Sequence, residues 1–219
     1  MIKVERSQPA PASLAEEAKK KNGQYNKLDV IERLKEDFNN KCYICGIDKL
    51  QDPEVEHRLP HKNGKYPERK FDWNNLFLSC GHCNSVKNKD IYDTGIIDCC
   101  IRDPEECLIF DFGENNISVS ANNPDDTEAQ LTAKLMYEVF NTENTGIRNI
   151  RSQMRLDTLL EQMNILITAL KKYKDNPKNK FALRILRSYL EKKSAFAEFK
   201  RAYVRKRLNE LPSLQEYLK

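Results

Sequence analysis

Four cysteines in two Cys-x-x-Cys pairs frame a stretch of this chain that is rich in residues able to do chemistry. A Glu-His dipeptide and an asparagine lie between the pairs, and a second asparagine follows them directly: Cys42, Cys45, Glu56, His57, Asn75, Cys80, Cys83 and Asn84. Two such pairs can bring four thiolates to one tetrahedral Zn²⁺. A neutral imidazole can accept a proton from water near pH 7. The pattern therefore predicts a zinc site beside a hydrolytic site.

The four cysteines are predicted to be ligands of a structural zinc ion: Cys42, Cys45, Cys80 and Cys83. Closed Cys₄ sites are structural, with Zn–S distances of about 2.3 Å. The 34 residues between the pairs leave room for a functional loop. A small module with few large apolar residues gains folding energy from such an ion. The alternative is four ordinary reduced cysteines in a core.

The residues between the two pairs and just after the second pair predict the parts of a hydrolase. His57 is the candidate general base. Hydrolysis of a phosphodiester also requires a cation against the phosphate. The Glu56 carboxylate and the Asn84 amide oxygen are candidate ligands for Mg²⁺ or Mn²⁺, which prefer oxygen donors. Lys87, one turn after Asn84, could hold a phosphate oxygen as a point charge.

The remaining polar residues of the module are open to more than one interpretation. Arg58 and His61 are, with Lys87, candidate contacts to a nucleic acid. For His61, phosphate contact, support of the site and plain exposure are equally open. His82, inside the second pair, is expected to face solvent.

The segment Val-Glu-His-Arg-Leu-Pro at 55–60, with Trp-Asn-Asn-Leu-Phe-Leu-Ser-Cys at 73–80 and Cys-Asn-x-x-Lys at 83–87, resembles the HNH (ββα-metal) nuclease motif. The resemblance implies that His57 is the general base and that Glu56 is a metal ligand. It also implies that Asn75 orients the loop that carries His57, and that Asn84 is the metal ligand at the last position of the motif. Asn84 stands where the family name has His. Glu56 stands where Asp is more often found.

The expected fold class is α+β, with a small zinc-stabilised ββα-metal module, a β-hairpin and a mostly α-helical C-terminal half. We divide the chain into four segments. Residues 1–23 are an extended N-terminal tail for partner docking, and residues 24–97 are the HNH module with its Cys₄ site. Residues 98–126 are an acidic hairpin linker, and residues 127–219 are a helical domain that is basic at its end. Apolar Ile2, Val4 and Leu14 suit the tail for docking on another protein.

Periodicity predicts the elements within these segments. Apolar residues at helical spacing predict helices over 26–39, from Thr127 onward, and over 146–173, 180–193 and 194–210, with Thr127 as a candidate N-cap. Extended runs are expected around 55–59 and 75–79, with a short helix from the second cysteine pair. A hairpin is expected from 108–112 and 117–119, joined through 113–116. In the long helix, a stripe that includes Ile150, Met154, Leu159 and Met163 is expected to face the core.

Charge is distributed unevenly along the chain. The net charge is +4, but residues 171–219 carry 15 Lys and Arg against 5 Asp and Glu. Residues 98–145 carry 2 against 11. A basic end can bind phosphate backbones or form solvated helix faces. The acidic middle is expected to face solvent or a protein partner.

The composition also bears on location. No run of about 18 apolar residues exists, so we expect no membrane span. The N-terminus lacks an apolar signal region. Cysteine pairs in such a chain favour metal thiolates in a reducing cytoplasm over disulfides.

Beyond the motif, the chain is similar to the HNH subunits of Septu-type and retron-associated anti-phage systems. The similarity includes a proline-containing tail, a core that begins near residue 40, and a helical C-terminal half. It implies an endonuclease that cuts nucleic acid, DNA before RNA, with an ABC/SMC-like ATPase partner. The chain itself has no P-loop. The alternatives are an RNA- or tRNA-cleaving nuclease with the same site, or a non-catalytic zinc-scaffolded subunit that binds nucleic acid or protein.

Overall fold

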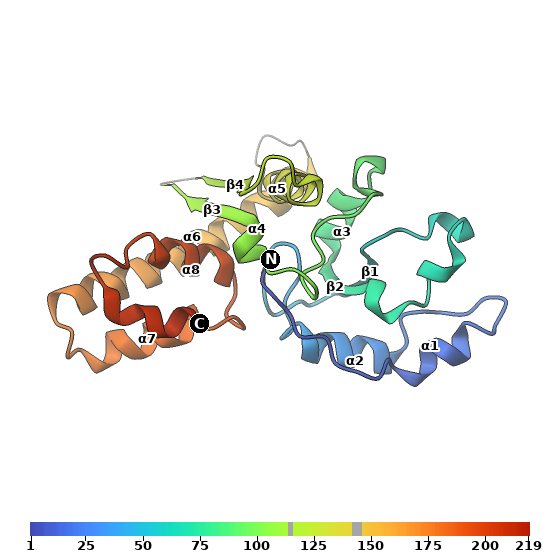
Figure 1. The fold of residues 1–219 in the computed structure, drawn as a ribbon, viewed down its shortest axis with the longest axis horizontal. Coiled ribbons are helices and arrows are strands. Elements are labelled where there is room, and N and C mark those ends of the chain that lie inside the picture. Colours follow the sequence, from blue (N-terminus) through green and yellow to red (C-terminus); the bar gives the residue numbers. More distant parts are fainter. Residues whose placement is uncertain (114–115, 142–145) are drawn as a thin grey trace.

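The computed structural model describes residues 1–113, 116–141 and 146–219, which fold into helices and two small antiparallel hairpins (Figure 1). This confirms the mixed helix and strand class. The helices and strands are α1 Ala12–Glu17, α2 Leu28–Asp37, β1 Pro53–His57, β2 Leu76–Cys80, α3 Gly81–Lys87, α4 Pro104–Cys107, β3 Leu108–Phe112, β4 Ile117–Ala121, α5 Thr127–Phe140, α6 Ile147–Asp175, α7 Lys180–Leu190 and α8 Ala197–Arg205. Short 3-10 turns are Lys62–Gly64, Pro67–Arg69, Trp73–Asn75, Asp90–Tyr92 and Pro212–Leu218.

The first hairpin and the helix after it form the centre of the predicted module. Strands β1 and β2 pair antiparallel, with Glu56 opposite Phe77 and His57 opposite Leu76. Every residue of β2 is buried, because its Leu-Phe-Leu run packs on both faces. Helix α3 follows β2 without a loop and contacts both strands. The β-β-α order expected from the extended runs around 55–59 and 75–79 and the helix at the second cysteine pair is therefore present.

The N-terminal segment is part of the fold. Ile2, Val4 and Leu14 are buried against this chain itself, and α1 forms within the segment expected to be extended. The guanidinium of Arg6 lies over the rings of Trp73 and Phe77 and donates to the carbonyls of Trp73 and Leu76. Because they are buried, the side chains of Ile2, Val4 and Leu14 are not free for a partner. A docking role for residues 1–23 stays a prediction.

The second hairpin matches its prediction, while the start of the next helix differs. Strands β3 and β4 pair antiparallel, and Glu114 and Asn115 of the predicted loop lie outside the described residues. Helix α5 begins at Thr127, but its N-cap is Asp126, whose carboxylate accepts from the amide of Ala129 at 3.1 Å. A carboxylate at this position satisfies an unpaired amide of the first turn.

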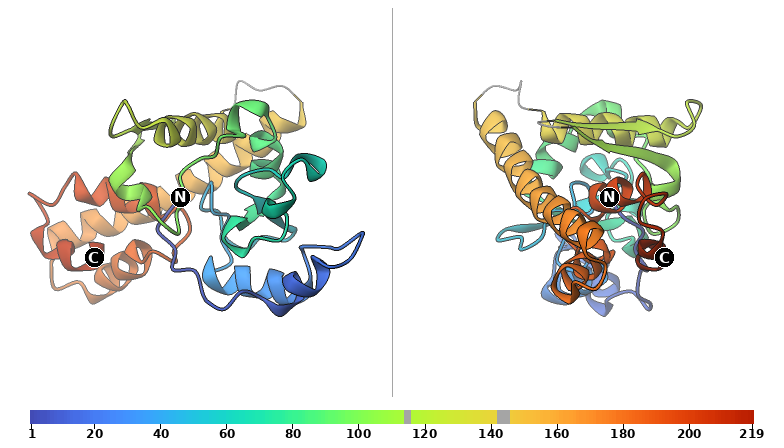
Figure 2. Two further views of the ribbon diagram at one scale, coloured as in Figure 1. Left: turned by 45° about the vertical axis from the view of Figure 1, so that its right-hand side comes forward. Right: turned by 90° about the vertical axis from the view of Figure 1, so that its left-hand side faces the viewer.

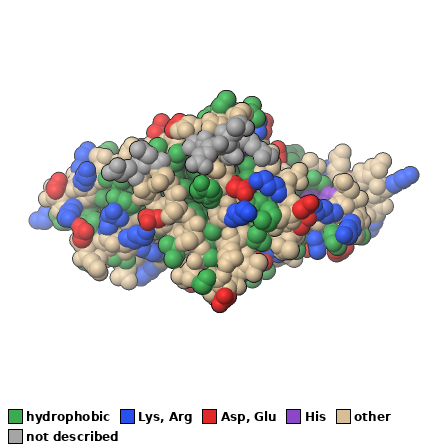
Figure 3. Space-filling model, turned by 90° about the horizontal axis from the view of Figure 1, so that it is seen from above, with side chains coloured by type: hydrophobic (Ala, Val, Ile, Leu, Met, Phe, Trp, Pro, Cys, Tyr) green, Lys and Arg blue, Asp and Glu red, His purple; other side chains and the backbone are tan. Residues whose placement is uncertain are grey.

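The acidic linker and the basic C-terminal end bind each other. Glu105 accepts from Arg201 at 2.9 Å and from Arg205 at 2.5 Å, and Asp111 pairs with Lys206 at 2.9 Å. Although burial acts in the opposite direction, the two guanidiniums lower the pKa of Glu105. For the buried side chains of Glu105 and Arg201, the expected exposure to solvent, partner or phosphate is wrong, whereas Asp111, Arg205 and Lys206 are paired but remain exposed. On the face in Figure 3, basic and acidic side chains are interspersed and form no single basic patch.

Helix α6 buries less of its predicted stripe than expected. Leu159 and Met163 are fully buried, but Ile150 and Met154 are 58% and 63% exposed. The N-terminal half of α6 extends along the module, whereas its C-terminal half packs on α7 (Figure 2). Within the described residues, no helix is long and apolar enough to cross a bilayer.

Candidate active site

The four paired cysteines converge on one point. The sulfur atoms of Cys42, Cys45, Cys80 and Cys83 all lie within 4.8 Å of one another, and all four residues are buried. Tetrahedral Zn²⁺ with Zn–S bonds of about 2.3 Å holds its sulfurs about 3.8 Å apart. The donor set and its spacing therefore fit zinc. In the described part of the chain, no other group of three or more His, Cys, Asp or Glu is arranged to hold a metal.

One further residue, which sequence reasoning did not select, contacts this cluster. Arg155 of α6 donates from Nη2 to the sulfur of Cys80 at 3.0 Å. Hydrogen bonds with the other three thiols, together with the charge of Arg155, lower the pKa of Cys80. Four thiolates on Zn²⁺ carry a net negative charge, which a buried guanidinium partly offsets. The site is thus tied to a helix 75 positions away in the sequence.

A cavity of about 670 Å³ lies between β1, α3 and the loop after β1. Its walls include most of the residues that the sequence predicts for catalysis and binding: Glu56, His57, His61, Asn84 and Lys87. Two further residues with chemical potential, which sequence reasoning missed, also line it: Tyr25 and Glu54. Asn75 and Arg58 do not line the cavity.

His57 is held in an orientation suited to a base. Its Nε2 lies 3.0 Å from the carbonyl oxygen of Lys70. A carbonyl can only accept, so Nε2 carries the hydrogen and the lone pair remains on Nδ1. The ring of Tyr25 packs edge-on against the imidazole at 4.4 Å. Burial lowers the pKa of His57 to about 4, so the imidazole is neutral at pH 7.

We expect the His57 imidazole to titrate near pH 4 in the folded protein, against an ordinary value of 6.5. Because the unfolded imidazole takes up its proton at the higher pH, this group makes the fold less stable as pH falls from about 6.5 to about 4. NMR titration of the histidine ring resonances measures the pKa. The resonance lost in His57→Gln identifies the residue. A midpoint at or above 6.5 would contradict the orientation and burial described here.

Glu56 and Lys87 form a buried pair. Lys87 Nζ lies 2.6 Å from Glu56 Oε1 and donates to the carbonyl of His57 at 3.1 Å. The hydroxyl of Tyr43 donates to Glu56 Oε2 at 2.5 Å. Burial raises the pKa of Glu56, and Lys87 and Tyr43 oppose that effect. The structure thus places Glu56 and Lys87 against each other, where the sequence predicted a metal ligand and a phosphate contact.

Asn84 contacts a different carboxylate from the one expected. Its Nδ2 lies 2.6 Å from Oε2 of Glu54. Glu54 is on the same strand as Glu56, but it is exposed. Carboxylate and amide oxygens are the donors that Mg²⁺ and Mn²⁺ prefer. The Glu-x-Glu-His order along β1 was the available signal for Glu54. Sequence reasoning did not select Glu54 because the motif resemblance includes only the Glu56-His57 dipeptide of this strand.

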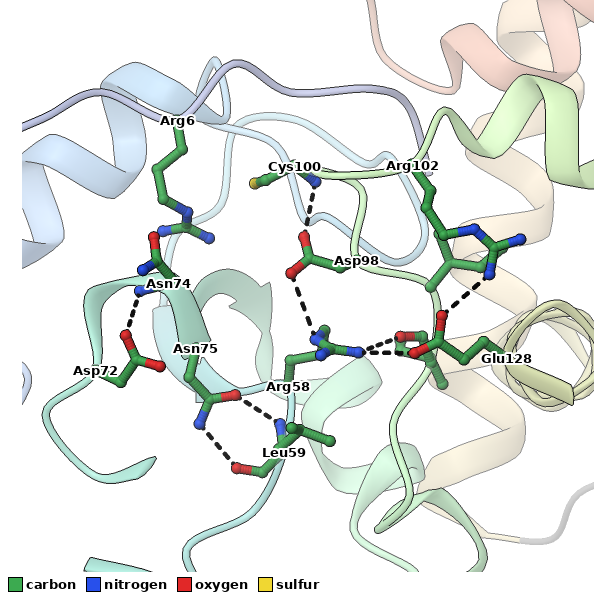
Figure 4. A network of polar contacts seen from close by, with 12 residues as sticks. Arg6, Arg58, Leu59, Asp72, Asn74, Asn75, Asp98, Cys100, Arg102 and Glu128 are labelled. Atoms are coloured by element: carbon green, nitrogen blue, oxygen red, sulfur yellow. Dashed lines mark hydrogen bonds and ion pairs between the residues drawn. The ribbon is translucent and has the colours of Figure 1, made fainter. Parts of the chain in front are cut away.

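Asn75 holds the loop that follows His57 (Figure 4). Its Oδ1 accepts from the amide of Leu59 at 2.8 Å, and its Nδ2 donates to the carbonyls of Leu59 and Arg69 at 2.8 and 3.0 Å. Three hydrogen bonds from one buried amide connect the two ends of the loop. This is the arrangement that the predicted loop-orienting role of Asn75 requires.

Replacing Asn75 with alanine is expected to lower the free energy of unfolding by about 2–4 kcal/mol. The change removes three hydrogen bonds and leaves buried backbone groups of Leu59 and Arg69 without partners. Urea denaturation measures the loss. Its neighbour Asn74 is exposed, so Asn74→Ala is expected to change stability by no more than about 0.5 kcal/mol. Equal effects of the two substitutions would be inconsistent with the loop-holding role.

The other predicted contacts differ in where they lie. Arg58 bonds to the carbonyl of Ile96 at 2.8 Å and pairs with Asp98 and Glu128 (Figure 4), and it does not line the cavity. His61 lines the cavity, with its ring 4.9 Å from that of His57. The expectation that His82 faces solvent is wrong: it is 3% exposed, and its Nε2 lies 3.0 Å from the carbonyl of Val139.

Comparison with known proteins agrees with this geometry over one segment. A family model described as HNH endonuclease matches residues 42–90. No curated protein matches the chain. The matched residues run from the first cysteine of the cluster to just beyond α3, so they contain both the four cysteines and most of the cavity wall. Residues 42–90 are thus an HNH endonuclease domain, which supports a nuclease.

Proposed function

We propose that this chain is a metal-dependent endonuclease that hydrolyses phosphodiester bonds, with His57 as its general base. The observation that carries the proposal is a neutral imidazole whose Nε2–H is bound to the Lys70 carbonyl, on the wall of a cavity shared with Glu54 and Asn84. A zinc-scaffolded binding module would have no use for a base held in one tautomer beside oxygen donors. We therefore favour the nuclease over the non-catalytic alternative.

The step assigned to this chain is proton removal from water. Nδ1 of His57 accepts a proton as the water oxygen attacks phosphorus, and the bond from phosphorus to the leaving oxygen breaks. That oxygen takes a proton from solvent. A divalent cation bound at the oxygen donors of the cavity supplies charge stabilisation at the phosphate. The Lys70 carbonyl stabilises the imidazolium that forms, and Asn75 keeps the loop around the base in place.

We further propose DNA as the substrate and a bacterial anti-phage complex in the cytoplasm as the setting, with an ABC/SMC-like ATPase as partner. The support is the similarity of the tail, hairpin and helical half to such HNH subunits, together with the lack of a P-loop in this chain. An HNH site that reads phosphate geometry need not reject a 2′-hydroxyl, so RNA is the substrate to be tested against DNA.

The test is cleavage by the full chain, alone and co-purified with the product of the neighbouring gene. Supercoiled plasmid and total RNA are incubated with Mg²⁺ or Mn²⁺, with EDTA as the control for metal dependence. We expect nicked or linear plasmid in the presence of metal and none with EDTA. If RNA is cleaved and plasmid DNA is not, the substrate is RNA and the DNA proposal is wrong. No cleavage of either substrate by either preparation would refute the nuclease proposal.

A further inference from the structure

Two glutamates on one strand have opposite surroundings. Glu54 and Glu56 are two positions apart on β1, so their side chains leave the strand on the same face, toward α3. Both line the cavity. Glu56 is only 5% exposed, whereas Glu54 is an exposed residue. The difference determines which of the two carboxylates a cation from solvent can reach.

The Glu56 carboxylate is already neutralised within the fold. One of its oxygens accepts from Lys87 at 2.6 Å and the other accepts from Tyr43 at 2.5 Å. A divalent ion at Glu56 would have to displace a buried ammonium and leave that charge without a partner, which is strongly unfavourable. The pair also connects α3 to β1. Glu56 therefore serves as the counter-ion of Lys87.

The Glu54 carboxylate and the Asn84 amide are close enough to share one cation. Their nearest atoms, Oε2 and Nδ2, are 2.6 Å apart. Rotation of the Asn84 amide by half a turn exchanges its nitrogen and oxygen and places two oxygens side by side. Adjacent ligands of octahedral Mg²⁺, at about 2.1 Å from the ion, lie about 3 Å apart. A small shift of either side chain therefore suffices.

The backbone at the start of α3 also leaves space for this carboxylate. A Cβ atom on Gly81 would lie 2.8 Å from Oε1 of Glu54. Glycine at this position lets the carboxylate approach the first turn of α3 without a steric conflict. A larger residue at this position would require the end of the Glu54 side chain to shift.

We propose that Glu54 and Asn84, and not Glu56, hold the divalent cation of this site. The ion is of the Mg²⁺ or Mn²⁺ class, which is commonly bound through one or two carboxylates and retains several waters. The catalytic use of this ion rests on the proposed function, but its binding does not. The assignment moves the metal ligand two residues along β1 from the position that the sequence motif indicates.

The test measures Mn²⁺ binding to the full, zinc-loaded chain by electron paramagnetic resonance, with no substrate present. We expect the wild-type chain to bind one Mn²⁺ in the cavity, and Glu54→Gln and Asn84→Ala to weaken binding at least tenfold. Glu68→Gln, an exposed carboxylate outside the cavity, is the control and should bind as the wild type does. Wild-type affinity in Glu54→Gln, or no Mn²⁺ binding by the wild-type chain, would overturn the proposal.

Further variants separate this proposal from the proposed function. Glu56→Gln is expected to retain Mn²⁺ affinity while lowering the melting temperature, because it removes the charge that faces Lys87. Loss of Mn²⁺ binding in Glu56→Gln with intact zinc content and fold would favour the motif position instead. If Mn²⁺ binds at Glu54 but no nucleic acid is cut, the nuclease proposal fails alone. If cleavage needs His57 but not Glu54, the metal assignment fails alone.

Discussion

Replacing His57 with alanine is expected to lower the rate of phosphodiester cleavage by about 10²–10⁴-fold, the usual contribution of a positioned general base. The imidazole has one nitrogen bound to the Lys70 carbonyl and a lone pair on the other. No second histidine combines such a bond with a place on the cavity wall: His82 also bonds a carbonyl, that of Val139, but does not line the cavity, and His61 has a buried Nδ1 with no hydrogen-bond partner. Initial rates at saturating Mg²⁺ measure the effect.

The control for this substitution is the neighbouring ring. His61 lines the same cavity 4.9 Å from His57, so His61→Ala removes a similar volume and a similar aromatic contact. We expect His61→Ala to retain activity within about tenfold of the wild-type rate. Zinc content and circular dichroism establish that both variants fold. A larger loss in His61→Ala than in His57→Ala would transfer the role of base to His61.

The low pKa of His57 determines the pH range in which it can act. A base that titrates near pH 4 is neutral throughout the range from 5 to 8. Such a base is weaker than an imidazole of ordinary pKa, so under the proposed mechanism the site would rely on charge stabilisation at the phosphate for much of its effect. The exposed carboxylate of Glu54, beside Asn84, is the proposed binding position of the cation that would supply this stabilisation.

Local spacing predicted the parts of the site that depend on neighbours in the sequence. The cysteine pairs converge because two residues between thiols allow both to face one point, and the β-β-α order follows from short apolar runs that end at the second pair. The loop-holding geometry expected of Asn75 is also present, because it acts on residues 59 and 69, which belong to the same module.

Long-range charge pairing was not predictable from spacing. Lys87 and Arg58 were expected to be free for phosphate, but each is bound to a carboxylate of this chain. Sequence alone shows the number of charges in a segment and cannot show which opposite charge tertiary packing brings within 3–4 Å. The same reason explains why Arg155, on a distant helix, could not be connected with the zinc cluster.

Loss of the zinc site is expected to unfold the module. Structural Zn²⁺ contributes about 10–16 kcal/mol of apparent binding free energy in small peptides, whereas a whole domain is stable by about 5–15 kcal/mol. Cys45→Ser is therefore expected to abolish zinc binding and the cooperative thermal transition of residues 42–90. Because Arg155 contacts Cys80 and the backbone of Phe196 donates to Gly46, parts of α6 and the start of α8 should lose protection from hydrogen exchange as well.

The matched control for the zinc prediction is another buried cysteine. Cys99 is as fully buried as Cys45 but lies outside the cluster. Cys99→Ser buries a hydroxyl in place of a thiol and is expected to lower stability by about 1–3 kcal/mol, with zinc retained. Metal analysis and hydrogen exchange of both variants measure the difference. A cooperative, unshifted melt of the Cys45→Ser protein without zinc would show that the cluster is not a structural metal site. In that case the packing between β2, α3 and α6 would have to hold the cavity residues in place without the ion.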